Sequence, residues 1–207
     1  MAHASRRGRF ITLEGVDGAG KSTHIPWIAQ RLRAAGHDVV VTREPGGTPL
    51  AEKLRALILA DPMDPLTETL LLFAARADHV RHIIRPALER GAWVVCDRFG
   101  DATVAYQGSG KGVALSLIEQ LAAAAHGGLK PDLTLVFDCS YEVSRKRLEA
   151  VGRPPDRFEA EDRAFFERVR AAYAGLARED PLRVRLIDGA ATIEQIRDEL
   201  QRHIAVP

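Results

Sequence analysis

The sequence predicts a three-layer α/β protein built on a parallel sheet of five strands. Five short runs are apolar along their whole length, which is typical of strands covered on both faces. Segments with helical periodicity separate these runs, and regular strand–helix alternation favours a parallel sheet between layers of helices. The strands are expected at Phe10–Leu13, Val39–Thr42, Trp93–Cys96, Leu133–Phe137 and Val184–Ile187.

Helical periodicity accounts for most of the sequence between these strands. Helices are expected at Ile25–Ala35, Leu66–Arg90, Leu115–Ala125 and Asp162–Ala177, and "IEQIRDELQRH" near the end of the chain reads as an amphipathic helix. The segment "RPPDRFEAE", Arg153 to Glu161, carries two prolines and several charges. It is therefore predicted to be an exposed loop between helices.

Composition limits the classes of function. The 207 residues are 46% hydrophobic and suit one domain, residues 1–207. A net charge of +1 gives no global field that favours nucleic acid or an anionic membrane, and no apolar run approaches the length of a membrane span. Cys96 and Cys139 each lie in or just after an apolar run, so buried free thiols in a reducing cytoplasm are expected.

A phosphate-binding loop follows the first strand. The stretch "GVDGAGKS", Gly15 to Ser22, fits the pattern G-x-x-x-x-G-K-[ST] and lies between a strand and a helix, as that pattern requires. Its glycines let backbone N–H groups turn toward phosphate oxygens, Lys21 can reach the terminal phosphates, and the Ser22 hydroxyl can ligate Mg²⁺. The chain is therefore predicted to bind a nucleoside triphosphate on a P-loop fold.

The other motifs and the length of the chain limit the reactions that this loop could serve. A GTPase should carry an Asn-Lys-x-Asp motif, which this sequence lacks, and motor or transporter ATPases are usually larger. A small-molecule kinase is the natural candidate at this length, and it needs a second site for its acceptor. Another nucleoside monophosphate kinase and a nucleotide-binding regulator without turnover remain as alternatives.

Four further segments supply a second site. They are "TREPGG" (Thr42 to Gly47), "LLLFAARADH" (Leu70 to His79), "CDRFGDATVAYQG" (Cys96 to Gly108) and "RLEAVGRPPDRFE" (Arg147 to Glu159). With the phosphate loop, they resemble the bacterial thymidylate kinases from about Arg9 to the last helix. The resemblance implies transfer of the γ-phosphoryl group of ATP to dTMP, giving dTDP for dTTP synthesis, with ATP and Mg²⁺. It also implies a lid at about 147–161 and a homodimer that packs helices against each other.

The resemblance assigns residues to each substrate. The ATP-binding residues would be Gly15, Val16, Asp17, Gly18, Ala19, Gly20, Lys21, Ser22, Thr23 and Arg147. Those that bind dTMP would be Asp17, Glu44, Arg55, Phe73, Arg76, Arg98, Thr103, Tyr106 and Gln107. Ser22 and Asp97 would lie at the metal.

Several of these roles have a physical rationale. A carboxylate accepts strongly from a hydroxyl, so Asp17 would hold the 3′-hydroxyl of dTMP; without the resemblance, a bond to nearby backbone N–H groups would be preferred. Arg98, at the carboxyl end of a strand, would grip the acceptor phosphate, and Arg55 would either join it or lie on a solvated helix face. Tyr106 would exclude a ribose hydroxyl at C2′.

The base should lie between an aromatic ring and polar groups. Arg76 matches the family's arginine, while the usual spacing of four residues places Leu72 at the aromatic position. Phe73, three residues before Arg76, shares that helix face and is the predicted stacking ring. Thr103 and Gln107 would contact the thymine edge. The histidines His79, His82 and His126 are expected on the surface or in packing, not in catalysis.

Catalysis should need no strong base, because the acceptor is already an anionic phosphate oxygen. Positioning and charge neutralisation by Lys21, Arg98, Mg²⁺ and a lid arginine are expected instead. Some members of the family carry an arginine in the phosphate loop where this chain has Gly18. Arg153 is therefore the predicted catalytic lid arginine, with Arg157 as the alternative.

Overall fold

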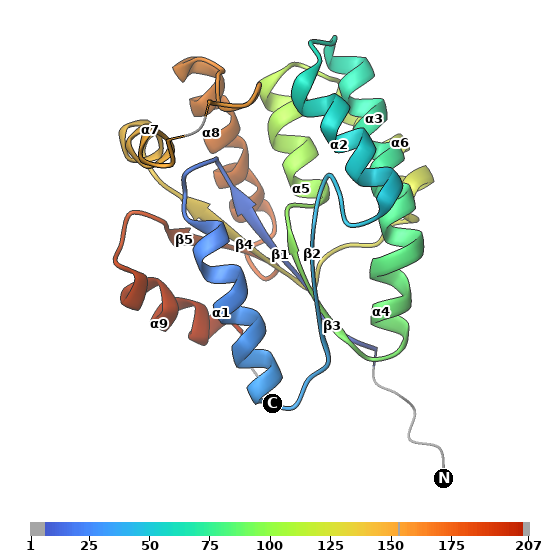
Figure 1. Ribbon diagram of the computed structural model, residues 1–207, viewed down its shortest axis with the longest axis vertical. Coiled ribbons are helices and arrows are strands. Elements are labelled where there is room, and N and C mark those ends of the chain that lie inside the picture. The colour runs from blue at the N-terminus through green and yellow to red at the C-terminus, as the bar shows by residue number, and fades with distance from the viewer. Residues whose placement is uncertain (1–6, 153, 205–207) are drawn as a thin grey trace.

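The computed structural model describes residues 7–152 and 154–204, and within them it contains the predicted parallel sheet (Figure 1). The strands are β1 (Phe10–Gly15), β2 (Val39–Arg43), β3 (Trp93–Asp97), β4 (Leu133–Asp138) and β5 (Val184–Asp188). Their order is β2-β3-β1-β4-β5, and every neighbouring pair is parallel. All carboxyl ends therefore meet along one edge of the sheet, where α/β proteins bind ligands.

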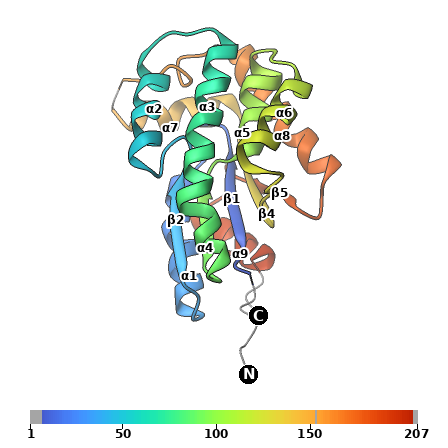
Figure 2. The ribbon, with the colours of Figure 1, turned by 90° about the vertical axis from the view of Figure 1, so that its right-hand side faces the viewer.

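Helices cover both faces of the sheet. Helices α1 (Lys21–Ala34) and α9 (Ile193–His203) lie on one face, and α3 (Pro65–His79) and α4 (Arg85–Glu89) lie on the other (Figure 2). The remaining helices are α2 (Pro49–Ala60), α5 (Gly100–Thr103), α6 (Leu115–His126), α7 (Tyr141–Ala150) and α8 (Arg163–Glu179). No helix among the described residues combines the length and apolarity needed to cross a bilayer.

Two apolar clusters pack the helices against the sheet. The larger core joins Ile28 and Leu32 of α1 and Val169 of α8 to the central strands, and the smaller one packs Ile84 and Leu88 against Val94 and its neighbours. Strands β1 and β4 are buried along almost their whole length, whereas the edge strands β2 and β5 are only partly buried. A continuous apolar run is therefore a more reliable sign of a central strand than of an edge strand.

Several helical segments differ from the sequence expectation, among them α7, which was not predicted. Helix α2, which was not among the predicted helices, begins after Thr48, whose side chain accepts from the Ala51 N–H. The predicted helix over Leu66–Arg90 is instead α3, a π-helical turn (Val80–Ile84) and α4. Pro86 lies just after this turn, and a proline cannot donate to the regular helical hydrogen-bond ladder.

The segment after β3 is also helical. Helix α5 runs directly into a π-helix at Val104–Gly110, a segment whose glycines argue against a helix by propensity. A Cβ at Gly108 would lie 2.9 Å from Leu115 Cδ2, and one at Gly110 would lie 2.5 Å from Phe165 Cε2. The glycines therefore allow this π-helix to approach α6 and α8 closely.

The predicted lid segment lies between α7 and α8. Arg153 itself is outside the described residues. Pro154 and Pro155 are exposed as expected, but Arg157 and Phe158 are half-buried and Glu159 is buried. The segment is thus only partly an exposed loop, because Arg157 donates to the Ile58 carbonyl and to Glu68.

Candidate active site

The phosphate loop folds around its own lysine. Lys21 is buried at the start of α1, and its Nζ donates to the carbonyls of Gly15 (3.0 Å) and Val16 (2.8 Å). Burial and the neighbouring Arg98 lower the Lys21 pKa, against nearby carboxylates. Gly20, at φ 104°, caps α1 without a side-chain hydrogen bond, so the first N–H groups of the helix have no side-chain acceptor at the cap. This arrangement suits an anion.

Helix α7 is fastened to the same loop. Ser144 Oγ donates to the Asp17 carbonyl (2.7 Å), and Arg147 Nη1 donates to the carbonyls of Gly18 (3.2 Å) and Gly189 (2.7 Å). A Cβ at Gly18, where φ is +74°, would lie 2.7 Å from the Ser144 carbonyl oxygen. A side chain at this position would displace α7, so the loop has no space for an arginine at residue 18.

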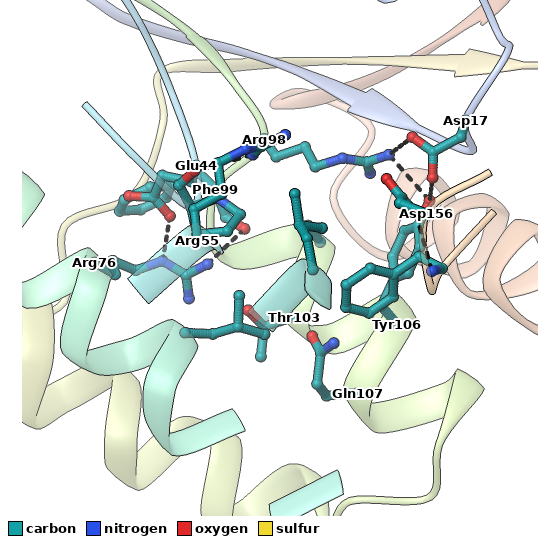
Figure 3. Close-up of a pocket in the computed structure, with 15 residues that line it drawn as sticks. Asp17, Glu44, Arg55, Arg76, Arg98, Phe99, Thr103, Tyr106, Gln107 and Asp156 are labelled. Atoms are coloured by element: carbon teal, nitrogen blue, oxygen red, sulfur yellow. Dashed lines mark hydrogen bonds and ion pairs between the residues drawn. The ribbon is translucent and has the colours of Figure 1, made fainter. Parts of the chain in front are cut away.

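An open cavity of about 640 Å³ lies beside the phosphate loop (Figure 3). Of the nine residues predicted for dTMP, the cavity wall includes Asp17, Glu44, Arg55, Arg76, Arg98, Thr103, Tyr106 and Gln107. Segments far apart in the sequence therefore converge on one cavity, with Asp17 belonging to both the loop and the wall.

Asp17 and Arg98 form the charged end of the cavity. Arg98 Nη2 donates to Asp17 Oδ1 (2.6 Å) and to the Tyr106 hydroxyl (3.0 Å), and that hydroxyl lies 3.3 Å from Asp17 Oδ2 (Figure 3). Burial opposes ionisation of Asp17, but Arg98 and Lys21 outweigh it and lower the pKa of its carboxyl. Arg98 has φ 69°, a left-handed conformation that a non-glycine residue adopts at a cost.

Glu14 supports this end and was missed in the sequence. Its buried carboxylate accepts from the Phe99 N–H (2.7 Å) and from the Tyr173 hydroxyl (2.7 Å), which lies 3.4 Å from Arg98 Nη1. Burial, with repulsion from Asp101, raises the Glu14 pKa to about 7. The available signal was a carboxylate inside an apolar strand, directly before the phosphate loop.

Arg76 and Glu44 form the opposite end. Arg76 Nε donates to Glu44 Oε2 (2.6 Å) and Nη2 donates to the Phe99 carbonyl (3.0 Å). Its Nη1 is buried without a hydrogen-bond partner among the described residues. Glu44 is also 3.0 Å from His79 Nδ1, and His79 Nε2 is 2.6 Å from the Thr42 hydroxyl. His79 therefore belongs to a chain of hydrogen-bonded side chains behind the cavity. The sequence had predicted only a surface or packing role for it.

The other two histidines match the expectation. His82 is largely exposed and its Nδ1 lies 3.1 Å from Asp78. His126 is buried between aromatic rings, with centroid distances of 6.5 Å to Phe73 and 5.2 Å to Phe99.

The predicted stacking ring lies outside the cavity wall. Phe73 does not line it and is buried against His126, whereas Leu72 lines the wall together with Arg76. With 3.6 residues per turn, residues four apart in an α-helix share a face slightly more closely than residues three apart do. Leu72, the residue at the family's spacing of four, is thus on the cavity wall and Phe73 is not, and the rings that line the cavity are those of Phe99, Tyr106 and Phe158.

Arg55 is on the cavity wall, not on a solvated face of α2. Its Nη1 donates to the Pro45 carbonyl (3.0 Å), which directs the guanidinium toward the cavity. Burial and the nearby Arg43 lower the Arg55 pKa. Arg55 and Arg98 together supply two cations for an anionic ligand.

The donors predicted for a metal are sparse. Asp97 Oδ1 is buried without a hydrogen-bond partner among the described residues, and Ser22 is exposed at the start of α1. Residues 7–152 and 154–204 contain no group of three or more histidine, cysteine or acidic side chains that could cage an ion. One hydroxyl and one free carboxylate oxygen fit Mg²⁺, which keeps several waters and takes other ligands from substrate phosphates.

Of the two predicted lid arginines, the structure describes Arg157. Arg153 lies outside the described residues. Arg157 donates to Glu68 Oε2 (2.5 Å) and to the Ile58 carbonyl (2.8 Å and 3.1 Å). It therefore fixes the lid segment to α2 and α3.

Comparison with known proteins identifies close relatives. The thymidylate kinase family model matches residues 13–200. Thymidylate kinase from Cupriavidus necator is 56% identical over 201 residues, covering 96% of this chain and 98% of the relative. Thymidylate kinase from Bordetella pertussis is 55% identical over 198 residues, covering 96% and 95%. The crystal structure of thymidylate kinase from Ehrlichia chaffeensis superposes with a TM-score of 0.77 at 35% identity, covering 95% and 97%.

Proposed function

The chain belongs to the thymidylate kinase family, and from that membership we propose that it transfers the γ-phosphoryl group of ATP to dTMP. The products are ADP and dTDP, which feeds dTTP synthesis. One observation in the structure supports the proposal independently of family membership. Asp17 belongs to the phosphate loop and also lines the acceptor cavity. A triphosphate on the loop and a nucleotide in the cavity would meet at this residue.

The donor side is assigned to the loop and α7. Backbone N–H groups of residues 15–23 cradle the phosphates of ATP, and Lys21 exchanges its carbonyl partners for phosphate oxygens. Arg147, held against the loop by Gly18 and Gly189, contributes a further cation at the donor. Ser22 and Asp97 would hold Mg²⁺, which neutralises phosphate charge when bound.

The acceptor phosphate is assigned to Arg98 and Arg55. Both guanidinium groups line the cavity, and bidentate bonds to phosphate suit them. Asp17 accepts from the 3′-hydroxyl of the sugar. The ring of Tyr106, held by its hydroxyl to Arg98, closes the space at C2′ to a ribose hydroxyl.

The thymine edge is assigned to the far end of the cavity. Arg76 Nη1, buried and unpartnered among the described residues, suits the carbonyl oxygen of a base. Glu44 holds that guanidinium in place. Thr103 and Gln107 complete the edge, and Leu72 and Phe99 pack on the base.

The mechanism follows from positioning and charge. The phosphate oxygen of dTMP attacks without losing a proton, so no general base is needed. Lys21 and Arg98 hold the two reacting phosphates in line, and Arg153 covers the transferring group. Exclusion of water by the lid prevents hydrolysis of ATP.

A coupled assay of ADP release tests the proposal. ADP should form only when ATP, dTMP and Mg²⁺ are all present. Absence of ADP release from folded protein that binds ATP would favour the regulatory alternative. ADP release without dTMP would indicate an ATPase.

Lys21→Ala is the matched variant for this assay. The substitution should leave a folded protein, because Lys21 serves the ligand and not the core, and it should lower turnover by ~10³ or more, since a principal charge on the phosphates is lost. Thermal unfolding serves as the folding control. Turnover close to the unmodified protein would remove the loop from the active site.

We also propose a cytoplasmic homodimer. The two cysteines are free and buried, which suits a reducing compartment. Exposed Leu66, Leu70 and Ala74 form an apolar stripe along α3, beside α6, and such a stripe suits helix packing between subunits. Sedimentation of the pure protein as a monomer at micromolar concentration would contradict the dimer.

A further inference from the structure

Glu68 is the centre of a buried polar cluster next to the acceptor cavity. Its side chain lies in the first turn of α3 and is fully buried. It accepts from Gln107 Nε2 (2.7 Å), Lys111 Nζ (2.8 Å) and Arg157 Nη2 (2.5 Å). These three donors come from the π-helix, the turn that follows it and the lid segment, so one carboxylate joins three parts of the site.

The cluster determines which end of the Gln107 amide faces the cavity. Glu68 forms ion pairs with Lys111 and Arg157, and a carboxylate only accepts hydrogen bonds. The amide nitrogen of Gln107 must therefore face Glu68. Its Oε1 receives no hydrogen bond from the described residues, and Figure 3 shows the amide end pointing into the cavity between Thr103 and Tyr106.

We propose that Glu68 is a positioning residue for base selection, which fixes Gln107 so that Oε1 is presented to the base as an acceptor. The inference rests on the proposed function. Thymine and uracil carry a donor, N3–H, that matches this acceptor. Cytosine carries an acceptor at N3, and two facing acceptors leave both without a hydrogen bond.

A purely structural role predicts something different. Glu68 also anchors the lid through Arg157, and loss of that anchor should slow transfer to every acceptor alike. Loss of Gln107 orientation should instead change the ratio between acceptors. The two roles are therefore separated by the ratio of kcat/KM for dCMP to that for dTMP.

Glu68→Gln tests the proposal. Two facing amides can pair in either orientation, so the variant lets Gln107 present its nitrogen to the cavity. The dCMP to dTMP ratio of kcat/KM should rise by about ten-fold or more, on the scale of one buried hydrogen bond to a base. The dUMP to dTMP ratio should stay constant, because both bases carry N3–H. Arg76 still disfavours the amino group of cytosine, so dTMP remains the better substrate.

Lys111→Met is the control within the cluster. It removes one cation but leaves the carboxylate and Arg157, so both ratios should stay unchanged. Gln107→Leu should raise the dCMP to dTMP ratio by itself, and Glu68→Gln should add nothing in that background. If Glu68→Gln does not fold, Glu68→Gln/Lys111→Met keeps the charges balanced and replaces it, and Gln107→Leu still tests the readout.

The outcomes separate this inference from the proposed function. An unmodified protein that phosphorylates dTMP, with a dCMP to dTMP ratio that Glu68→Gln or Gln107→Leu leaves unchanged, overturns the inference alone. An equal loss with all acceptors in Glu68→Gln also overturns it. An unmodified protein that does not phosphorylate dTMP overturns both.

Discussion

At the scale of single residues, the acceptor cavity depends on buried charges that neighbouring groups compensate. Arg98 is held by Asp17, Arg76 by Glu44, and Glu44 by His79. Each side chain that would touch substrate is fixed by a group behind it, so little motion is needed before the reaction. Glu14 is the exception, because burial outweighs the favourable contacts with Arg98 and Tyr173 and raises its pKa to about 7.

Glu14 should give the protein a pH-dependent stability. Its folded pKa, about 7, is raised above the ordinary value of 4.5, so the folded state binds this proton more tightly than the unfolded state does. The stabilisation is fully present below pH 4.5 and is lost as the pH rises through 7. Glu14→Gln should therefore gain stability relative to the unmodified protein between pH 5 and pH 8.5, by up to about 3 kcal/mol.

Urea unfolding at several pH values measures this difference. Glu52→Gln is the control: its hydrogen bond with Arg43 lowers the Glu52 pKa, so the contribution of Glu52 to stability is constant above pH 4.5 and is lost only at lower pH. The Glu52→Gln difference should stay flat over the same range. A flat difference for Glu14→Gln as well would show that Glu14 is ionised throughout.

Residues with a local signature could be predicted from the sequence, and those defined by distant partners could not. Lys21, Arg98 and Tyr106 stand in motifs that fix their position relative to a strand end. Glu68 is recognised only through Gln107 and Arg157, which are 39 and 89 residues away. Phe73 and Leu72 differ by one residue on a helix, and the rotation of α3 about its axis, which decides between them, is set by packing.

At the scale of elements, the segment between α7 and α8 connects donor and acceptor. Helix α7 is bonded to the phosphate loop through Ser144 and Arg147, and Arg157 bonds the following segment to α2 and Glu68. The segment therefore bridges both sides of the site. The absence of space for a side chain at Gly18 supports the prediction that the mobile arginine comes from this segment.

Arg153→Ala should separate catalysis from binding. An arginine that meets the phosphates mainly in the transition state contributes to kcat, so its loss should lower kcat by ~10³ or more. Affinity for dTMP, measured by calorimetry, should hardly change because Arg98 holds the acceptor phosphate. Arg157→Ala should instead weaken dTMP binding, because it frees the lid segment. The reverse pattern would assign catalysis to Arg157.

The elements themselves were predictable where periodicity is clear. Central strands are apolar throughout, and α1, α6, α8 and α9 carry regular helical patterns. Helices α2, α5 and α7 and the π-helix at Val104–Gly110 were not predicted, because proline, glycine and short length mask the helical pattern. Close contacts of Gly108 and Gly110 with α6 and α8 stabilise the π-helix, and such tertiary contacts override local propensity.

At the scale of the whole molecule, the strand order creates the site. The phosphate loop follows the carboxyl end of β1. The neighbouring strand β3 ends at Asp97, directly before Arg98. Parallel pairing brings Leu13 of β1 opposite Asp97, so the loop and the acceptor arginine lie at the same edge. Residues of α2, α3 and the π-helix then line the cavity beside that edge.

An acceptor panel tests the central claim most directly. With ATP and Mg²⁺, kcat/KM is measured for dTMP, dUMP, UMP, dCMP, AMP and GMP. dTMP should be the best acceptor, because Arg76 and Gln107 would hydrogen-bond to the edge of a base with N3–H and Tyr106 closes the space at C2′. Ribonucleotides should gain relative to dTMP in Tyr106→Ala. Equal use of UMP and dTMP by the unmodified protein, or a purine monophosphate as the best acceptor, would contradict it.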